Sequence, residues 1–197
     1  MISSVNRPYY LCIRAILKAF IRVFLFLKGF RITGGEHLPG KRQPVIVIAN
    51  HADLADSVYL ICSIRPRITI CGARPAYFQK RVVRHIFTIA NILKVENREQ
   101  FLGDCGLLLG KGEVILIYPE MGRNPEGLGA FKTWAAEVAL AAGTPVIPCY
   151  LYGTTRGETG RKQLFAGPAM MPHGDSVVFT QKLREAVLSL KPAGLEE

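Results

Sequence analysis

The chain lacks the cysteine patterns of a metal site or of a disulfide framework. Its 197 residues include five cysteines, an odd number, and no two of them have the spacing of zinc ligands or of a redox pair. Disulfide frameworks are typical of small secreted domains. We therefore expect no bound metal, and reduced thiols in the core of a protein that faces the cytosol. The cysteines are Cys12, Cys62, Cys71, Cys105 and Cys149.

Two motifs of well-known enzyme classes are also missing. No Gly-x-Ser-x-Gly elbow occurs, which argues against a serine hydrolase of that type. The segment Gly106–Lys111 has some likeness to a phosphate-binding loop, but it is one residue too short and no Ser or Thr follows the lysine. We therefore exclude a P-loop nucleotide enzyme.

Acidic residues are scarce. Asp and Glu number 15 against 25 Lys and Arg, which gives a formal net charge of +10 and an isoelectric point near 9.6. This excess favours nucleic acids, lipid headgroups or phosphorylated substrates as partners. The interleaved basic and aromatic motifs of nucleic-acid modules are missing, so we expect no nucleic-acid partner. With 49% hydrophobic residues and a mean hydropathy of +0.21, a lipid surface is favoured.

Residues 9–30 are the most apolar segment, but charges interrupt it. Its uncharged runs, such as Val23–Leu27, are far shorter than the roughly twenty residues of a membrane span. Arg14, Lys18 and Arg22 recur every four residues and so form one basic stripe on a helix. We predict that residues 1–30 form an amphipathic membrane-associating segment, with apolar side chains in lipid and the stripe at anionic headgroups. A core helix with a solvated basic edge is an equally good interpretation.

Short apolar runs alternate with helical stretches over residues 31–197, and this pattern predicts an α/β domain. Val45–Ala49 and Val114–Tyr118 contain apolar and aromatic side chains only, which is typical of strands buried on both faces. Strands separated by helices indicate a largely parallel or mixed central sheet flanked by helices. Further strands are expected at Phe30–Thr33, Ile68–Cys71, Ala90–Val95, Pro145–Leu151 and Val177–Phe179, and helices at Asp53–Ser63, Phe101–Gly110, Phe131–Ala142 and Thr180–Leu190.

His51 comes just after the first of these buried strands. His51 and Asp56 are five residues apart, so they cannot share one face of a continuous helix. They meet only if His51 lies in the turn before a helix and Asp56 in its first turn, with Asp53 as a plausible N-cap. Asp56 would then fix the imidazole tautomer and leave the other ring nitrogen free as a general base. The simpler interpretation is a helix-start histidine and a carboxylate that complements the helix dipole.

Seven basic side chains gather between residues 65 and 85. They fit a patch that binds phosphate or headgroups, although a solvated helix face is the commoner explanation. The residues are Arg65, Arg67, Arg74, Lys80, Arg81, Arg84 and His85.

Four motifs then occur in a characteristic order. They are His51-x4-Asp56, Lys94–Arg98, Tyr118–Arg123 and Val146–Pro148. In this order they resemble the four sequence blocks of the glycerolipid acyltransferase family, which includes glycerol-3-phosphate and 1-acylglycerol-3-phosphate acyltransferases. The resemblance runs from about residue 31 to residue 154, which is most of the predicted domain.

The third block departs from the family pattern Phe-Pro-Glu-Gly-Thr-Arg-Ser. Tyr118 stands in place of Phe, Met121 in place of Gly, and Asn124 in place of Ser. Glu120 and Arg123 match the pattern.

The resemblance implies acyl transfer from a thioester to an alcohol. His51 would deprotonate the acceptor hydroxyl as it attacks the thioester, and Asp56 would orient the imidazole. The acceptor oxygen is itself the nucleophile, so no acyl-enzyme is needed. The expected donor is acyl-CoA or acyl carrier protein, no further cofactor is expected, and the expected acceptor is 1-acylglycerol-3-phosphate, which would yield phosphatidic acid.

The resemblance also implies which residues bind substrate. Arg123, with Arg98 or Lys94, would hold the phosphate of the acceptor, and Glu120 would bind acceptor hydroxyls or hold Arg123. Asn97 stands where the family has arginine, which leaves glycerol 3-phosphate, another lysolipid or a glycolipid open as acceptors. A catalytically idle membrane-binding homologue is the alternative of a different class. The expected location is the cytoplasmic face of a membrane.

Overall fold

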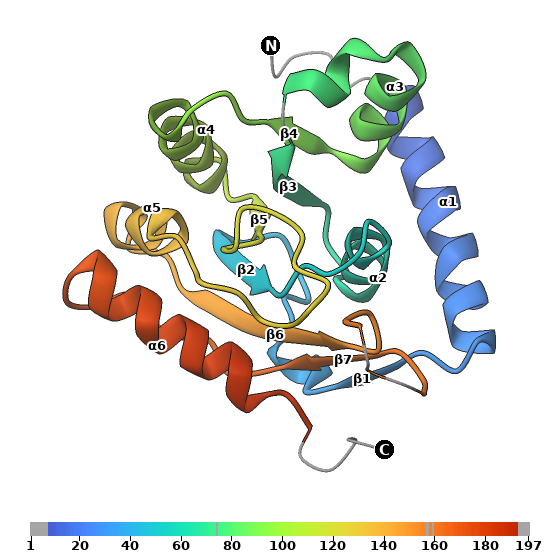
Figure 1. Ribbon diagram of the computed structural model, residues 1–197. Coiled ribbons are helices and arrows are strands. Elements are labelled where there is room, and N and C mark those ends of the chain that lie inside the picture. Colours follow the sequence, from blue (N-terminus) through green and yellow to red (C-terminus); the bar gives the residue numbers. More distant parts are fainter. Residues whose placement is uncertain (1–7, 74, 157, 159, 193–197) are drawn as a thin grey trace.

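The computed structural model describes residues 8–73, 75–156, 158 and 160–192, and these form an α/β fold around one seven-stranded sheet (Figure 1). The strands are β1 Arg31–Thr33, β2 Val45–Ala49, β3 Ile68–Ala73, β4 Ile92–Lys94, β5 Val114–Ile117, β6 Val146–Tyr152 and β7 Gln163–Ala166. Their order across the sheet is β1-β7-β6-β2-β5-β3-β4. All neighbouring strands are parallel except β6 and β7, which are antiparallel. The predicted mixed sheet flanked by helices is therefore confirmed.

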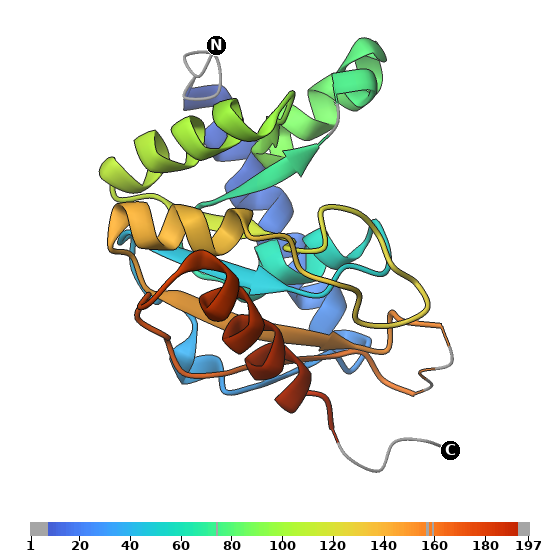
Figure 2. The same ribbon diagram turned by 60° about the vertical axis from the view of Figure 1, so that its left-hand side comes forward.

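Helices lie on both sides of this sheet (Figures 1 and 2). They are α1 Pro8–Leu27, α2 Asp56–Ser63, α3 Arg81–Ala90, α4 Arg98–Gly110, α5 Trp134–Ala142 and α6 Ser176–Ser189, with short 3-10 helices η2 Gly35–His37 and η3 Pro75–Gln79. One apolar cluster joins the sheet to α4, α5 and α6, and a second joins it to α2. Helix α1 packs against α2 and α3. Of the five free cysteines four are buried in this fold, and Cys12 is exposed.

The central strands β2, β5 and β6 are buried along their whole length. Helices cover both faces, which explains why these segments consist of apolar residues without alternation. Since β2, β3, β5 and β6 run parallel, their carboxyl ends meet at one edge of the sheet. In open α/β sheets this edge is where ligands bind.

The C-terminal part of the chain corrects one prediction and adds an element. The predicted strand Val177–Phe179 is instead the first turn of α6. Asp175 is the N-cap, and its Oδ1 accepts hydrogen bonds from the amides of Val177 and Val178 at 2.8 and 2.9 Å. This cap outweighs the β propensity of the two valines. Strand β7 was not expected; it extends the sheet by pairing with β6 and β1.

Helix α1 turns part of its basic stripe toward the protein. The ammonium group of Lys18 donates to the carbonyl groups of Ile64, Arg65 (3.1 Å) and Pro66 (3.3 Å), just past the end of α2. Arg14 donates to two carbonyls in the last turn of α3. Cations are favoured there because the last carbonyls of a helix lack partners and carry the negative end of its dipole. The prediction that this stripe faces lipid headgroups is therefore wrong for Arg14 and Lys18.

The opposite side of α1 is apolar and open to solvent. Phe20 and Phe26 are 72% and 78% exposed, and Ile16, Val23 and Leu27 are similarly uncovered. Within the described residues, no helix combines the length and apolar character needed to span a bilayer. A contiguous exposed apolar face of this kind marks a contact surface for a lipid or a protein.

The basic cluster between residues 65 and 85 divides into two parts. Arg67 has a structural contact, since its guanidinium donates to the Asn91 side chain at 3.0 Å. Arg81, Arg84 and His85 are exposed on α3, beside the exposed apolar side chains of Val82 and Ile86. Arg74 lies outside the described residues.

We predict that Lys18→Met loosens α1 from the rest of the protein. The change leaves the carbonyls beyond α2 without their donor, and a hydrogen bond to a charged group contributes about 1.5–3 kcal/mol. Amide hydrogen exchange across residues 11–27 should accelerate about tenfold or more. Arg22→Met is the matched control, because Arg22 is exposed on the same stripe. Equal exchange in the two variants would contradict this assignment.

Candidate active site

The site begins where β2 ends, at a buried asparagine. Asn50 is 2% exposed, and its amide group donates to the carbonyl of Leu151 at 3.1 Å and accepts from the Leu151 amide at 2.7 Å. Through these two bonds the Asn50 side chain pairs with the main chain of β6, just beyond the last residue of β2. They fix the direction in which the chain leaves the sheet, and so the position of His51.

His51 and Asp56 form the centre of the site. Asp56 is fully buried, and its Oδ2 lies 3.1 Å from Nδ1 of His51. The same oxygen accepts hydrogen bonds from the amides of Ala52 (2.7 Å) and Asp53 (2.8 Å). The carboxylate also sits in the first turn of α2, where the helix dipole favours negative charge.

This geometry sets the tautomer of His51. Nδ1 carries the hydrogen, because it faces a carboxylate that accepts. The other nitrogen, Nε2, then carries the lone pair, and no described residue forms a hydrogen bond with it. The expected N-cap role of Asp53 is wrong: α2 begins at Asp56, and Asp53 instead accepts from the Ala55 amide at 2.8 Å within the turn. No N-cap side chain holds the start of α2; instead the Asp56 carboxylate holds the preceding turn through the amides of Ala52 and Asp53.

Tyr118 covers one face of the His51 ring. The two rings are stacked, with centroids 4.0 Å apart and planes inclined by 14°. The Tyr118 hydroxyl lies 2.9 Å from Oγ of Ser57, which is the second residue of α2. Burial raises the pKa of this hydroxyl, so it stays protonated. An aromatic face also stabilises a cationic imidazolium. The sequence predicts Tyr118 as the end of a strand and as a departure from the family pattern, and it contains no signal for the contact of Tyr118 with His51 and Ser57.

Glu120 links the histidine turn to the loop after β5. Its Oε1 accepts from the His51 amide at 3.0 Å, and its Oε2 accepts from the Gly129 amide at 2.8 Å. Burial raises the pKa of Glu120, and these amide donors act in the opposite direction. The expected contact between Glu120 and Arg123 is not present in the described structure. Glu120 holds the main chain of the site instead.

The loop between β5 and α5, residues 118–133, folds over the ends of the central strands (Figure 2). The Asn124 amide donates to the His51 carbonyl at 2.6 Å, which places the neighbouring Arg123 beside the histidine turn. Arg123 is exposed, and no described residue forms a hydrogen bond or an ion pair with it. Its guanidinium is thus available to an anionic ligand.

Met121 explains one position of the third block. It has a φ of 55°, in the left-handed region that glycine adopts without strain. The family's glycine therefore suits the backbone here, and this chain places a methionine in the same conformation. The Met121 side chain packs on the apolar cluster beneath α4 to α6.

The remaining basic residues that were expected at the site have acidic partners elsewhere. Arg98, the first residue of α4, pairs with Glu137 of α5 at 2.5 Å. Lys94 pairs with Glu96. The structure shows no direct contact between either residue and His51. Sequence spacing alone did not reveal these pairings, because Glu137 lies 39 residues after Arg98.

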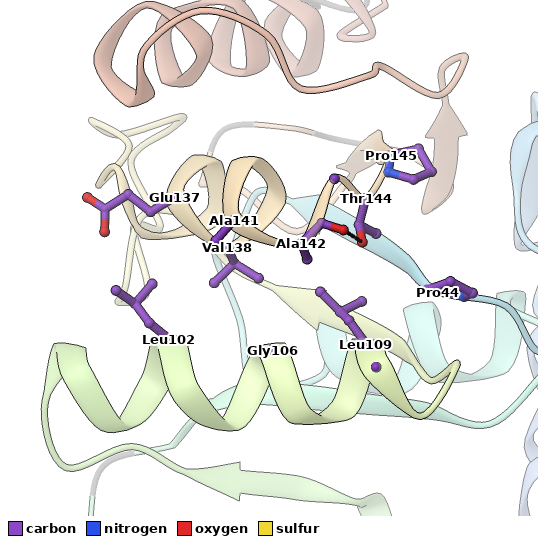
Figure 3. A pocket seen from close by; sticks show the side chains of 12 residues that line it. Pro44, Leu102, Gly106, Leu109, Glu137, Val138, Ala141, Ala142, Thr144 and Pro145 are labelled. Carbon is purple, nitrogen blue, oxygen red and sulfur yellow. Dashed lines mark hydrogen bonds between the residues drawn. The ribbon is translucent and has the colours of Figure 1, made fainter.

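A cavity of about 430 Å³ lies between α4 and α5 (Figure 3). Leu102, Leu109 and Val138 line it from the two helices. None of the residues of the His51 turn is among its lining residues. No group of three or more His, Cys, Asp or Glu side chains in the described part of the chain is arranged to hold a metal ion.

The arrangement of the site is one that general-base chemistry at a histidine would require. A buried carboxylate orients His51, and a free arginine lies beside it at the open edge of the sheet. This is a histidine–aspartate site on a mixed α/β fold, suited to activating a hydroxyl group for attack.

Comparison with known proteins identifies the family. The sequence profile of the acyltransferase family matches residues 29–152. The chain therefore belongs to the acyltransferase family, and the resemblance noted from the four motifs is confirmed.

Two relatives and one solved structure are similar to the chain. A chloroplastic 1-acyl-sn-glycerol-3-phosphate acyltransferase of Brassica napus, BAT2, is 28% identical over 85% of this chain and 48% of its own length. A 1-acyl-sn-glycerol-3-phosphate acyltransferase of Borreliella burgdorferi is 28% identical over 71% of this chain and 58% of its own. The crystal structure of the 1-acyl-sn-glycerophosphate (LPA) acyltransferase PlsC of Thermotoga maritima has the same fold, with a TM-score of 0.69 and 19% identity over 90% of this chain and 80% of that one. The chain spans about half the length of the plant relative.

We predict that Asp56→Asn lowers the free energy of unfolding by about 1–3 kcal/mol. Oδ1 of Asp56 is buried without a hydrogen-bond partner among the described residues, so an amide NH2 group there has no acceptor. The bonds to the two backbone amides also lose their charge assistance. Urea unfolding measures the effect, and Asp53→Asn is the control because Asp53 is exposed. Equal stability of the two variants would refute this account of the turn.

Proposed function

We propose that the protein transfers a fatty acyl group from an acyl thioester to the hydroxyl of 1-acylglycerol-3-phosphate and so forms phosphatidic acid. The observation that carries this proposal is the His51–Asp56 pair, in which Nδ1 faces the buried carboxylate and Nε2 has no hydrogen-bond partner among the described residues. The names of the relatives, all acyltransferases that act on this acceptor, support the choice of substrate.

In the proposed reaction His51 acts as general base. The acceptor hydroxyl loses its proton to Nε2 while its oxygen attacks the thioester carbonyl carbon. The carbon–sulfur bond then breaks, and the thiolate takes the proton back from the imidazolium. Asp56 and the stacked ring of Tyr118 stabilise the imidazolium between these steps. No acyl-enzyme and no cofactor are needed, and acyl-CoA and acyl carrier protein are both suitable donors.

The phosphate of the acceptor is proposed to bind Arg123. This guanidinium is exposed and has no described partner, and its forked donors match a phosphate group. Arg98 and Lys94 contribute only if the phosphate displaces Glu137 and Glu96 from them. Glycerol 3-phosphate and other lysolipids remain the alternative acceptors.

The substrates and product are lipids, so we further propose that the enzyme works on a membrane surface, at its cytoplasmic face. The exposed apolar side of α1 is the docking face, with Phe20 and Phe26 inserted among the lipids. Basic side chains on α3, such as Arg81 and Arg84, add attraction to anionic headgroups.

Acyl transfer from a radiolabelled long-chain thioester to lysophosphatidate in mixed micelles tests the reaction. We expect phosphatidic acid from the wild type and at least about a hundredfold lower kcat from His51→Ala, because general-base catalysis contributes about 10²–10⁴-fold. Glycerol 3-phosphate and a neutral lysolipid serve as parallel acceptors. Equal rates from both proteins would exclude His51 as the base, and no transfer to any acceptor would support the idle homologue.

Vesicle sedimentation tests the docking face. Replacing both Phe20 and Phe26 by Gln should weaken binding to vesicles with anionic lipid at least about tenfold, since burying one such side chain contributes about 1.5–3 kcal/mol. Leu107→Gln is the control, because Leu107 is 58% exposed on α4, away from α1. Unchanged binding of the double variant would exclude α1 as the membrane contact.

A further inference from the structure

Helix α6 reaches the site although it lies beyond the part of the chain that matches the family. The family match ends at residue 152, and α6 covers residues 176–189. From this helix the half-buried Arg184 extends to the loop between β5 and α5. Its Nε donates to the Gly129 carbonyl at 3.0 Å, and its terminal nitrogen lies 3.3 Å from the Leu128 carbonyl.

Gly129 is also linked, through Glu120, to the His51 turn. While its carbonyl accepts from Arg184, its amide donates to Oε2 of Glu120 at 2.8 Å. The other oxygen of Glu120 accepts from the His51 amide at 3.0 Å. A continuous series of hydrogen bonds therefore runs from Arg184 through Gly129 and Glu120 to His51.

The side chains of Glu120 and Asn124 lie close against Gly129. A Cβ atom added there would lie 2.7 Å from Nδ2 of Asn124 and 2.8 Å from Oε2 of Glu120. Both atoms belong to the ends of flexible side chains, so a larger residue at position 129 would displace the carboxylate of Glu120 and the amide of Asn124. Gly129 thus lets the Glu120 carboxylate lie directly against the loop.

Two main-chain hydrogen bonds also hold this loop, one to the His51 turn and one between the two ends of the loop. The Asn124 amide donates to the His51 carbonyl at 2.6 Å, and the Lys132 amide donates to the Pro119 carbonyl at 2.8 Å. Arg123, the proposed phosphate ligand, lies in this loop between Pro119 and Asn124. Arg184 adds a side-chain anchor from a separate helix to the part of the loop beyond Arg123.

We infer that Arg184 is a positioning residue for acyl transfer. It touches neither substrate; it holds the loop so that Glu120 fixes the His51 main chain and Arg123 faces the acceptor. The inference rests on the proposed function, because Arg123 is assigned to the acceptor there. The planar guanidinium suits this role, since two of its three nitrogens reach two neighbouring carbonyls in a fixed geometry.

Kinetics of Arg184→Gln and Arg184→Lys test the inference. We expect kcat/KM for the acceptor to fall at least about tenfold in Arg184→Gln, mainly through a higher KM, with the KM of the thioester donor unchanged. Arg184→Lys should recover part of the loss. Lys182→Gln is the control: it removes a positive charge from the same helix, and Lys182 contacts His173 instead of the loop.

Amide hydrogen exchange gives a readout that does not depend on activity. In Arg184→Gln, exchange across residues 127–131 should accelerate, while exchange in the central strands β2 and β5 stays as in the wild type. A wild-type rate at residues 127–131, or an acceleration that spreads equally over the whole protein, would overturn the inference.

The two proposals fail separately. If the wild type transfers no acyl group to lysophosphatidate, the proposed function fails, and the exchange comparison still decides whether Arg184 orders the loop. If the wild type and Lys182→Gln are active and Arg184→Gln has unchanged kinetics, the inference about Arg184 is wrong and the proposed function stands.

Discussion

The buried carboxylate of Asp56 is the constraint on which the site depends. A charged group without solvent is stable only when hydrogen-bond donors surround it, and one oxygen of Asp56 accepts from two backbone amides and from the imidazole. The need to gather these donors shapes the turn after β2 and sets the first residue of α2. The same bonds leave one nitrogen of His51 free. One polar requirement thus determines both the local fold and the orientation of the His51 ring.

Much of the fold could be predicted because its buried central strands consist of unbroken runs of apolar residues, which are visible in the sequence. The apolar runs Val45–Ala49 and Val114–Ile117 are typical of strands buried on both faces, and the structure places them side by side in the sheet. Elements whose identity depends on distant contacts could not be predicted. Strand β7 is short and is defined by its partners, and the start of α6 is decided by the cap at Asp175, against the local preference of Val177 and Val178.

The candidate site could be predicted only in part, for a similar reason. The spacing of His51 and Asp56 encodes a local contact, so the pair could be found without a structure. Contacts between remote residues have no such signal: Glu120 binds main-chain amides of His51 and Gly129, and Arg98 is held by Glu137. A carboxylate or a guanidinium in a sequence motif does not reveal which of its possible partners it has.

The contact of Lys18 with the end of α2 connects the N-terminal helix to the helix that carries Asp56. Helix α2 has eight residues, so it is about 12 Å long at 1.5 Å per residue. Lys18 bonds to the chain just beyond the C-terminal end of α2. Asp56, whose carboxylate orients His51, is the first residue at the N-terminal end. Helix α1 is therefore attached to the same short helix whose first residue orients His51, so α2 connects the N-terminal helix with the histidine turn.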